Sequence, residues 1–169
     1  EDDCFPTHDA VEIFTEELQT TEYDNNIFSI YGHPFLVPKE GETCSRFQGW
    51  GWSTTGEKLK KHIRKLIYLY SLREYEFLDF VNNALTPEVL RKLDVTPYRQ
   101  PTDTLRQFFA WDETLALLTV LSNQVHKKTT KRTIYNFGAC KDSSRFKDVN
   151  WYSKPPFNMV SHDSVWDFF

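Results

Sequence analysis

Residues 54–85, TTGEKLKKHIRKLIYLYSLREYEFLDFVNNAL, form the longest stretch of helical pattern in this chain. Thr54 and Glu57 match a capping box, in which a hydroxyl and a carboxylate satisfy the first free backbone N–H groups of a helix. The pair Thr86-Pro87 indicates that a new helix begins there. We therefore expect one long helix whose middle, residues 66–72, is buried on every side because it is apolar nearly all round. Its apolar face repeats every three or four residues: Leu59, Ile63, Leu66, Ile67, Tyr70, Phe77, Leu78, Val81 and Leu85.

A row of cations occupies the first turns of this expected helix, opposite its apolar face. Cations at a helix N-terminus oppose the macrodipole and cost about 0.3–1 kcal/mol each. Their placement favours an anion site, with phosphate or nucleic acid as the natural ligand. An ordinary solvated lysine face is the alternative. The residues are Lys58, Lys60, Lys61, Arg64 and Lys65, and the strongest candidates for binding are Lys58, Lys61, Arg64 and Lys65.

Two tryptophans, Trp50 and Trp52, lie in the loop that leads into this row. Side chains two residues apart point the same way in an extended chain, so both indoles are expected on one side. Exposed, they would form a stacking platform for a base or sugar ring, worth about 1–3 kcal/mol per stacked base. The alternative is that both rings fill the core beneath the helix.

Composition limits the classes of protein that this chain can belong to. Its 169 residues, 40% of them hydrophobic, predict one soluble domain with a substantial core. The net charge of −4 argues against a protein that coats nucleic acid. No apolar run approaches the ~20 residues that span a bilayer. The three cysteines lack a C-x-x-C pair, which excludes an all-cysteine zinc site and favours reduced thiols in an intracellular compartment.

The remaining periodicity predicts a mainly α fold, or α+β with a minor β element. A helix over 10–19, capped by Asp9, and a short helix over 87–93 are expected from their apolar spacing and start signals. A second long helix is expected over 104–125. The cluster His126, Lys127, Lys128, Lys131 and Arg132 would follow its C-terminus, where cations are favourable.

Short strands account for the β element. Residues 27–37 predict two strands in a small hairpin, and the prolines nearby place it at a sheet edge. His33 would then be a surface turn residue. Residues 133–137 predict one further strand, ended by Gly138.

The C-terminal residues 141–169 lack periodicity and form, by prediction, an extended segment distinct from a helical body over 1–140. A segment that is rich in rings and has no core of its own must dock on the body or on a partner. The candidate partner-binding residues are its aromatic side chains: Phe146, Trp151, Tyr152, Phe157, Trp166, Phe168 and Phe169.

These features favour a non-enzymatic structural or interaction subunit that binds a protein partner, or a second copy, through the aromatic C-terminal segment. A nucleic-acid or phosphate-ligand binder using the Trp loop and the cation row is the first alternative. A carboxylate-dependent hydrolase is the second, with Glu76 and Asp79 sharing one helix face. No nucleophile–base pair, phosphate loop or metal-ligand spacing is recognisable, so we expect no cofactor and no metal site.

Overall fold

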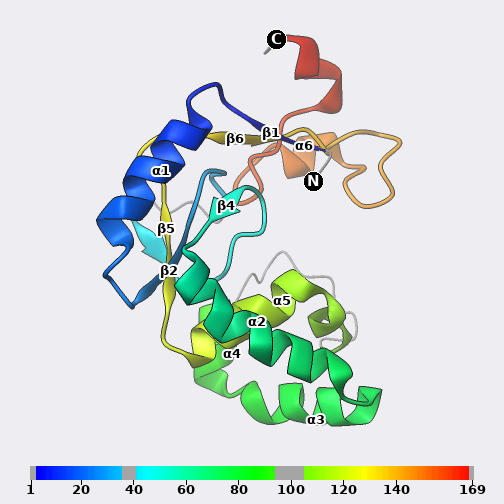
Figure 1. The fold of residues 1–169 in the computed structure, drawn as a ribbon. Coiled ribbons are helices and arrows are strands. Elements are labelled where there is room, and N and C mark those ends of the chain that lie inside the picture. Colours follow the sequence, from blue (N-terminus) through cyan, green and yellow to red (C-terminus); the bar gives the residue numbers. More distant parts are fainter. Residues whose placement is uncertain (1–2, 36–40, 94–104, 168–169) are drawn as a thin grey trace.

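The computed structural model describes residues 3–35, 41–93 and 105–167 (Figure 1). Of these residues 48% are helical and 14% lie in strands of two small sheets, so the prediction of a mainly α protein is wrong and the fold is α+β. The helices are α1 (Ala10–Thr21), α2 (Gly56–Ser71), α3 (Glu74–Ala84), α4 (Pro87–Leu93), η1 (Arg106–Phe109), α5 (Trp111–Leu121), α6 (Val149–Tyr152) and η2 (His162–Asp167). The strands are β1 (Cys4–Pro6), β2 (Ile27–Tyr31), β3 (Thr43–Cys44), β4 (Trp52–Ser53), β5 (Val125–Lys128) and β6 (Ile134–Asn136).

The larger sheet has the strand order β3-β5-β2-β4, which places β2 in its interior. Strand β2 pairs in parallel with β5 and antiparallel with β4, and Phe28, Ile30 and Tyr31 are fully buried. The expected hairpin at a sheet edge is therefore wrong for β2, whose neighbours come from distant parts of the chain. Residues 36 and 37 of the expected second strand lie outside the described residues. The smaller sheet pairs β1 with β6, the strand predicted over 133–137.

The stretch 54–85 forms two helices, α2 and α3, instead of one. Backbone helicity stops at Leu72, which is extended, and Arg73 begins α3 by a reciprocal cap. The Glu76 carboxylate accepts hydrogen bonds from the Arg73 backbone N–H (3.0 Å) and from its guanidinium group (2.7 Å). The N-cap of α2 is Thr55, whose hydroxyl accepts from the Lys58 N–H, while the Thr54 hydroxyl donates to the Phe28 carbonyl.

The second predicted long helix is also divided. It consists of η1 and α5, which ends at Leu121, and Asn123 takes a positive φ of 53° that turns the chain into β5. His126, Lys127 and Lys128 therefore lie in a strand and do not cap a helix, which corrects the prediction for this cluster. The expected helices over 10–19 and 87–93 are confirmed as α1 and α4, but the Asp9 side chain makes no capping hydrogen bond to α1.

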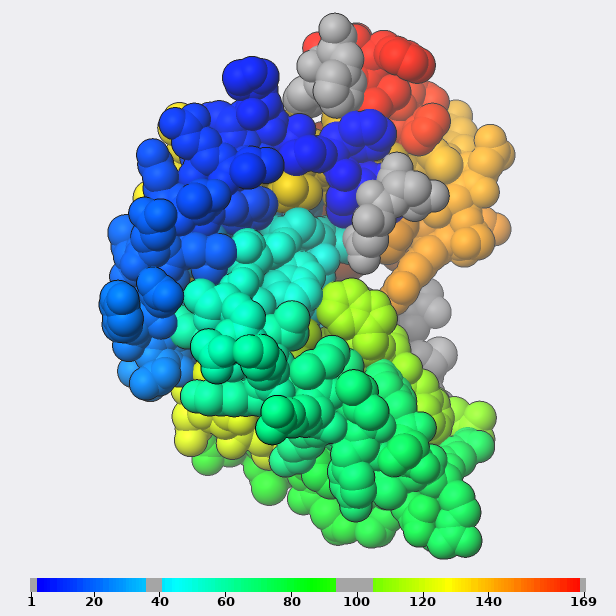
Figure 2. Space-filling model, in the orientation of Figure 1, coloured from blue at the N-terminus to red at the C-terminus, as the bar shows by residue number. Residues whose placement is uncertain are grey.

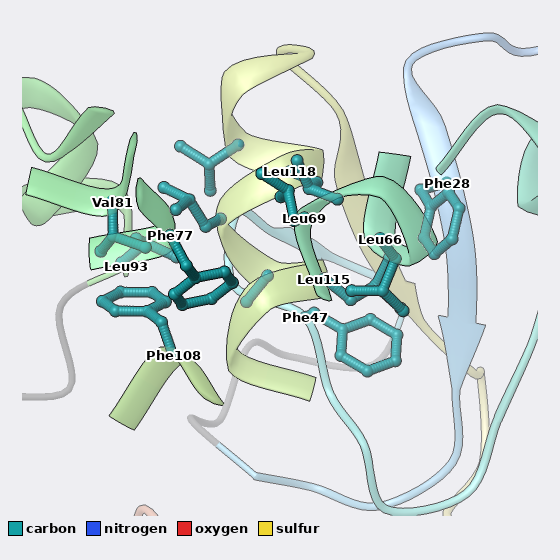
Figure 3. Packing of buried hydrophobic residues seen from close by; sticks show 13 residues of the cluster. Phe28, Phe47, Leu66, Leu69, Phe77, Val81, Leu93, Phe108, Leu115 and Leu118 are labelled. Atoms are coloured by element: carbon teal, nitrogen blue, oxygen red, sulfur yellow. The ribbon is translucent and has the colours of Figure 1, made fainter. Parts of the chain in front are cut away.

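Helix α5, not α2, is the element at the centre of the apolar core. All residues from Thr114 to Val120 are buried, which is the pattern of a helix surrounded by other elements. Figure 3 shows Phe77 and Phe108 on one side of α5, and Phe28 and Phe47 on the other. The middle of α2, predicted to be buried all round, instead keeps Ile67, Tyr68 and Tyr70 at the surface.

Helices α2 to α5 gather at one end of the molecule, and α1, the smaller sheet and the C-terminal segment lie at the other (Figure 1). The C-terminal segment contains α6 and η2, so it is not extended throughout. Backbone hydrogen bonds attach it to the body, including one from the Val160 N–H to the Asn136 carbonyl (2.8 Å). The Arg132 guanidinium donates to the Asn158 carbonyl at 3.0 Å.

Candidate interaction surface on helices α2 and α5

Large apolar side chains are exposed to solvent along one side of α2. Ile63, Ile67 and Tyr70 share this side because they are spaced four and three residues apart. Ile67 is 64% exposed, and the other two are about two-fifths exposed, at 38% and 41%. Isolated exposed apolar residues are common on protein surfaces, but a row of three on one helix requires an explanation.

Helix η1 and the start of α5 extend this apolar row. Phe109 and Trp111 are 40% and 45% exposed. The Tyr70 hydroxyl donates to the Phe109 carbonyl at 3.1 Å, which joins the two parts directly. Figure 2 shows α2 and residues near 110 side by side on one face of the molecule. We define the α2–α5 stripe as Ile63, Ile67, Tyr70, Phe109 and Trp111.

The aromatic members of the stripe are held in place by rings of the core. Phe77 stacks between Tyr70 and Phe109, with ring centroids 5.8 and 4.9 Å away. Trp111 lies edge-on to Phe47 at 6.0 Å and tilted against Trp52 at 6.4 Å. Because these rings already have fixed neighbours, little side-chain entropy remains to be lost when a partner covers them.

Among the cations of α2, Lys60 and Arg64 lie beside the stripe, three residues before Ile63 and Ile67, whereas Lys61 and Lys65 lie on the opposite side of the helix. Lys60 pairs with Glu57 in the same helix at 2.8 Å, and the Lys65 ammonium lies 5.6 Å from the centre of the Phe80 ring. Lys61 and Arg64 are exposed and form no ion pair with any other described residue. These four residues, Lys60, Lys61, Arg64 and Lys65, are called the cation row below.

Lys58 does not belong to the cation row, although its sequence position suggested that it would. It is 5% exposed, and its ammonium group donates to the carbonyls of Thr21 (2.7 Å) and Asp24 (2.9 Å) at the C-terminal end of α1. A cation at this helix end complements the unsatisfied carbonyls and the dipole. Burial lowers the pKa of Lys58, and the negative charge of Asp24 raises it by a smaller amount.

Trp50 and Trp52 do not form one platform. Gly51 between them has φ of 65°, so the chain is not extended there and the two rings separate. Trp50 packs against His33 and Phe35, with centroids 5.0 and 5.2 Å apart, whereas Trp52 packs against Phe28 and Phe47 in the core. His33, predicted at the surface, is fully buried, and this burial with the nearby Arg132 charge lowers its pKa to about 3.

The aromatic residues of the C-terminal segment divide into packed and exposed groups. The ring centroid of Phe146 lies 6.1 Å from that of Trp50. The ring centroid of Phe157 lies 5.6 Å from that of Phe35 and 4.8 Å from that of Tyr152. Trp151 is half exposed and Trp166 is 82% exposed. The predicted sites Phe168 and Phe169 lie outside the described residues.

One buried triplet resembles a nucleophile with its base. Ser29 Oγ lies 2.8 Å from His126 Nδ1, and Thr119 Oγ1 lies 3.2 Å from His126 Nε2. A catalytic hydroxyl must reach its substrate, yet all three residues are at most 1% exposed. Burial, with smaller contributions from His62 and Arg46, lowers the pKa of His126 to about 3. The triplet therefore fastens β2, β5 and α5 together and serves packing.

The candidate carboxylates Glu76 and Asp79 line a shallow hollow of about 630 Å³ between α2, α3 and Leu121. The hydrogen bonds from Arg73 lower the pKa of Glu76, which keeps it ionised at neutral pH. An ionised carboxylate cannot act as the general acid that such a pair requires. Among residues 3–35, 41–93 and 105–167, no three His, Cys, Asp or Glu side chains gather closely enough to hold a metal ion.

Sequence reasoning missed the stripe because its members were assigned to the core. Ile63, Ile67 and Tyr70 fit the apolar face of the helix, and Trp111 was placed inside a longer helix. A usable signal was present: residues 66–72 are apolar over more of the helix circumference than one core contact can cover.

None of the helices in the described part of the chain combines the length and apolar character that crossing a bilayer requires. Comparison of the chain with protein-family models, with curated proteins and with solved structures found no match.

Proposed function

We propose that this protein is a non-enzymatic interaction module that docks a partner on the α2–α5 stripe. The observation that supports it is the contiguous group of five large apolar side chains, three of them aromatic and fixed from below. Buried aromatic residues are the usual anchors of protein interfaces. Full burial of a side chain such as isoleucine contributes about 1.5–3 kcal/mol, and most of that remains available at Ile67.

The C-terminal segment is a second contact in this proposal. Phe146 and Phe157 pack on rings of the body, and Trp166 is 82% exposed, so this proposal assigns Trp166 to the partner. Helix η2, which contains Trp166, lies at the end of the molecule opposite α3 (Figure 1), so a partner that reaches both surfaces must span the body.

The two alternative functions receive less support. A nucleic-acid binder would use the cation row, but its stacking platform is absent because Trp50 and Trp52 pack in separate places. A carboxylate-dependent hydrolase would need a protonated acid, and Glu76 is paired with Arg73.

A photo-reactive amino acid placed at position 67, in cells that normally make the protein, tests the proposal. We expect a covalent conjugate with a discrete partner from position 67, and none from position 19, because Gln19 is an exposed polar site on α1. The same substitution at position 166 reports on the C-terminal contact. Absence of any conjugate from position 67, with equal expression of the variants, would refute docking on the stripe.

A further inference from the structure

We infer that the occupant of the α2–α5 stripe is the same stripe on a second copy of this chain, joined to the first in a two-fold dimer. The inference rests on the proposed function and names the partner. It follows from two features of the surface, which are the spacing of its apolar residues and the opposite charges on its two sides.

The apolar residues that α2 contributes to the stripe have the spacing that lets two identical helices interlock. Ile63, Ile67 and Tyr70 are separated by four and then by three residues, which is the spacing of the apolar seam between paired helices. Such a seam is complementary to itself, because each side chain of one helix fits between side chains of the other. The 16 residues of α2 form a rod about 24 Å long on which this contact can be made.

One side of the stripe carries a positive charge. Arg64 lies three residues before Ile67, so it is about 60° from it around the helix, on the side away from Tyr70. Its side chain is exposed and forms no ion pair with another described residue. Lys60, on the same side, is already paired with Glu57 at 2.8 Å. The charge that this side offers a partner is therefore that of Arg64.

The other side of the stripe carries a negative charge. Asp112 follows Trp111 in the first turn of α5 and is partly exposed. Burial raises the pKa of Tyr70, and the negative charge of Asp112 also raises it, which places this carboxylate near the Tyr70 hydroxyl. Within the part of the chain that the structure describes, Asp112 forms no ion pair. The stripe is thus bordered by Arg64 on one side and by Asp112 on the other.

A single two-fold rotation pairs both of these charges. In a two-fold interface the contact is reciprocal: when one residue faces a second residue of the other copy, that second residue also faces the first. Rotation about an axis that runs lengthwise between Arg64 and Asp112 lays stripe on stripe and exchanges the two sides. Arg64 of each copy then faces Asp112 of the other, and two identical ion pairs border the apolar seam. A different partner would have to present both charges at matching places, whereas this chain already contains them.

Other occupants match the surface less well. A β-strand would need a free sheet edge, and the stripe is built from helices. The Asp112 carboxylate at the border of the stripe repels both an anionic membrane and a nucleic acid. A second copy is therefore the occupant that the apolar spacing and the two charges favour together.

Sedimentation velocity of the full chain, over concentrations from about 1 to about 300 μM, measures self-association. A standard interface has about 20–30 residues on each side, so a seam of five predicts a reversible dimer with a Kd of tens of micromolar. Ile67→Gln should weaken it by at least about tenfold. Val11→Gln makes a similar change at a 76% exposed position of α1, at the other end of the molecule (Figure 1), and should have no effect. A chain that stays monomeric, or a dimer that Ile67→Gln leaves intact, would overturn the inference.

Exchange of charges tests the two-fold pairing itself. Arg64→Asp sets carboxylate against carboxylate and Asp112→Arg sets cation against cation, so each variant alone should dimerise at least about tenfold more weakly. An equal mixture of the two variants restores opposite charges at both pairs and should dimerise about as tightly as the unaltered chain, which also shows that both variants are folded. Single variants that dimerise normally, or a mixture no tighter than its components, would contradict this pairing. The controls Lys141→Asp and Glu12→Arg change exposed charges in the C-terminal segment and in the first turn of α1.

The photo-reactive residue at position 67 separates this inference from the proposed function. A conjugate at twice the 20.0 kDa mass of the chain supports the second copy. A conjugate with a different protein, from a chain that is monomeric, would overturn the inference and leave the proposed function standing, whereas absence of any conjugate and of any dimer would refute both. A monomeric chain that binds phosphatidylcholine vesicles and loses this binding in Ile67→Gln would assign the stripe to a membrane instead. A dimer that Trp166→Ser abolishes and Ile67→Gln does not would place the contact on the C-terminal segment and overturn the inference.

Discussion

Mild acid should destabilise the fold through two buried histidines. His33 and His126 are fully buried, and burial lowers the pKa of each to about 3. In the unfolded chain a histidine has a pKa near ~6.5. Between these values the unfolded state binds a proton that the native state does not, so stability is present above pH ~6.5 and is lost as the pH falls.

The size of the stability loss follows from the difference between the folded and unfolded pKa values of these histidines. One unit below the unfolded pKa, at pH ~5.5, each neutral buried histidine costs about 1.4 kcal/mol of stability relative to pH 8. The two together give about 2.8 kcal/mol, a large part of the 5–15 kcal/mol that is typical of a domain. His62, whose pKa burial also lowers, acts in the same direction. Carboxylates titrate mainly below pH ~5.5, so the histidines account for most of the stability change between pH 8 and pH ~5.5.

Urea unfolding at pH 8.0 and 5.5, followed by circular dichroism, measures this loss. We expect the free energy of unfolding to fall by about 2–3 kcal/mol with an unchanged slope against urea concentration. The variant His126→Gln should be less stable at pH 8 but should lose about half as much on acidification. A free energy of unfolding that is the same at both pH values would refute the assignment of these histidines as buried and neutral.

Three substitutions test the packing described above, each by urea unfolding against the unaltered chain. Leu117→Ala should cost about 2–5 kcal/mol because it opens a cavity beside fully buried α5; a loss below about 1 kcal/mol would contradict the central position of this helix. Lys58→Met should cost about 1–3 kcal/mol because the carbonyls of Thr21 and Asp24 lose a charged donor. An unchanged free energy of unfolding would contradict the burial of this side chain. Gly51→Ala should cost at least about 2 kcal/mol, since the residue has φ of 65° and a Cβ atom would lie 2.2 Å from Ile134 Cγ1; a neutral result would contradict the turn that separates Trp50 from Trp52.

Elements whose signals are local were predicted well. The apolar spacing of α1 and α4 lies within the helices themselves, and β6 ends at Asn136, two residues before Gly138. The break between α2 and α3 was missed because neither glycine nor proline marks it. Arg73 and Glu76 end one helix and start the next through hydrogen bonds that the helical pattern does not reveal.

Features that depend on distant residues could not be derived from the pattern. Strand β5 is defined by pairing with β2, about a hundred positions earlier, as in the Ser29–His126 hydrogen bond. His33 is buried by Trp50, and Lys58 by the end of α1. For the candidate surface, Lys61, Arg64 and Lys65 stay a prediction as anion-binding residues. Ile63, Ile67 and Tyr70 were assigned to the core because helical spacing does not say which apolar face is covered.

Docking on the α2–α5 stripe can be observed residue by residue in this 20.0 kDa chain. Isoleucine methyl and tryptophan indole signals would be followed by nuclear magnetic resonance while the partner captured at position 67 is added. We expect the largest shifts at Ile63, Ile67 and the Trp111 indole N–H. Shifts confined to Trp151 and Trp166, with the stripe unmoved, would contradict the stripe as the docking surface and assign binding to the C-terminal segment.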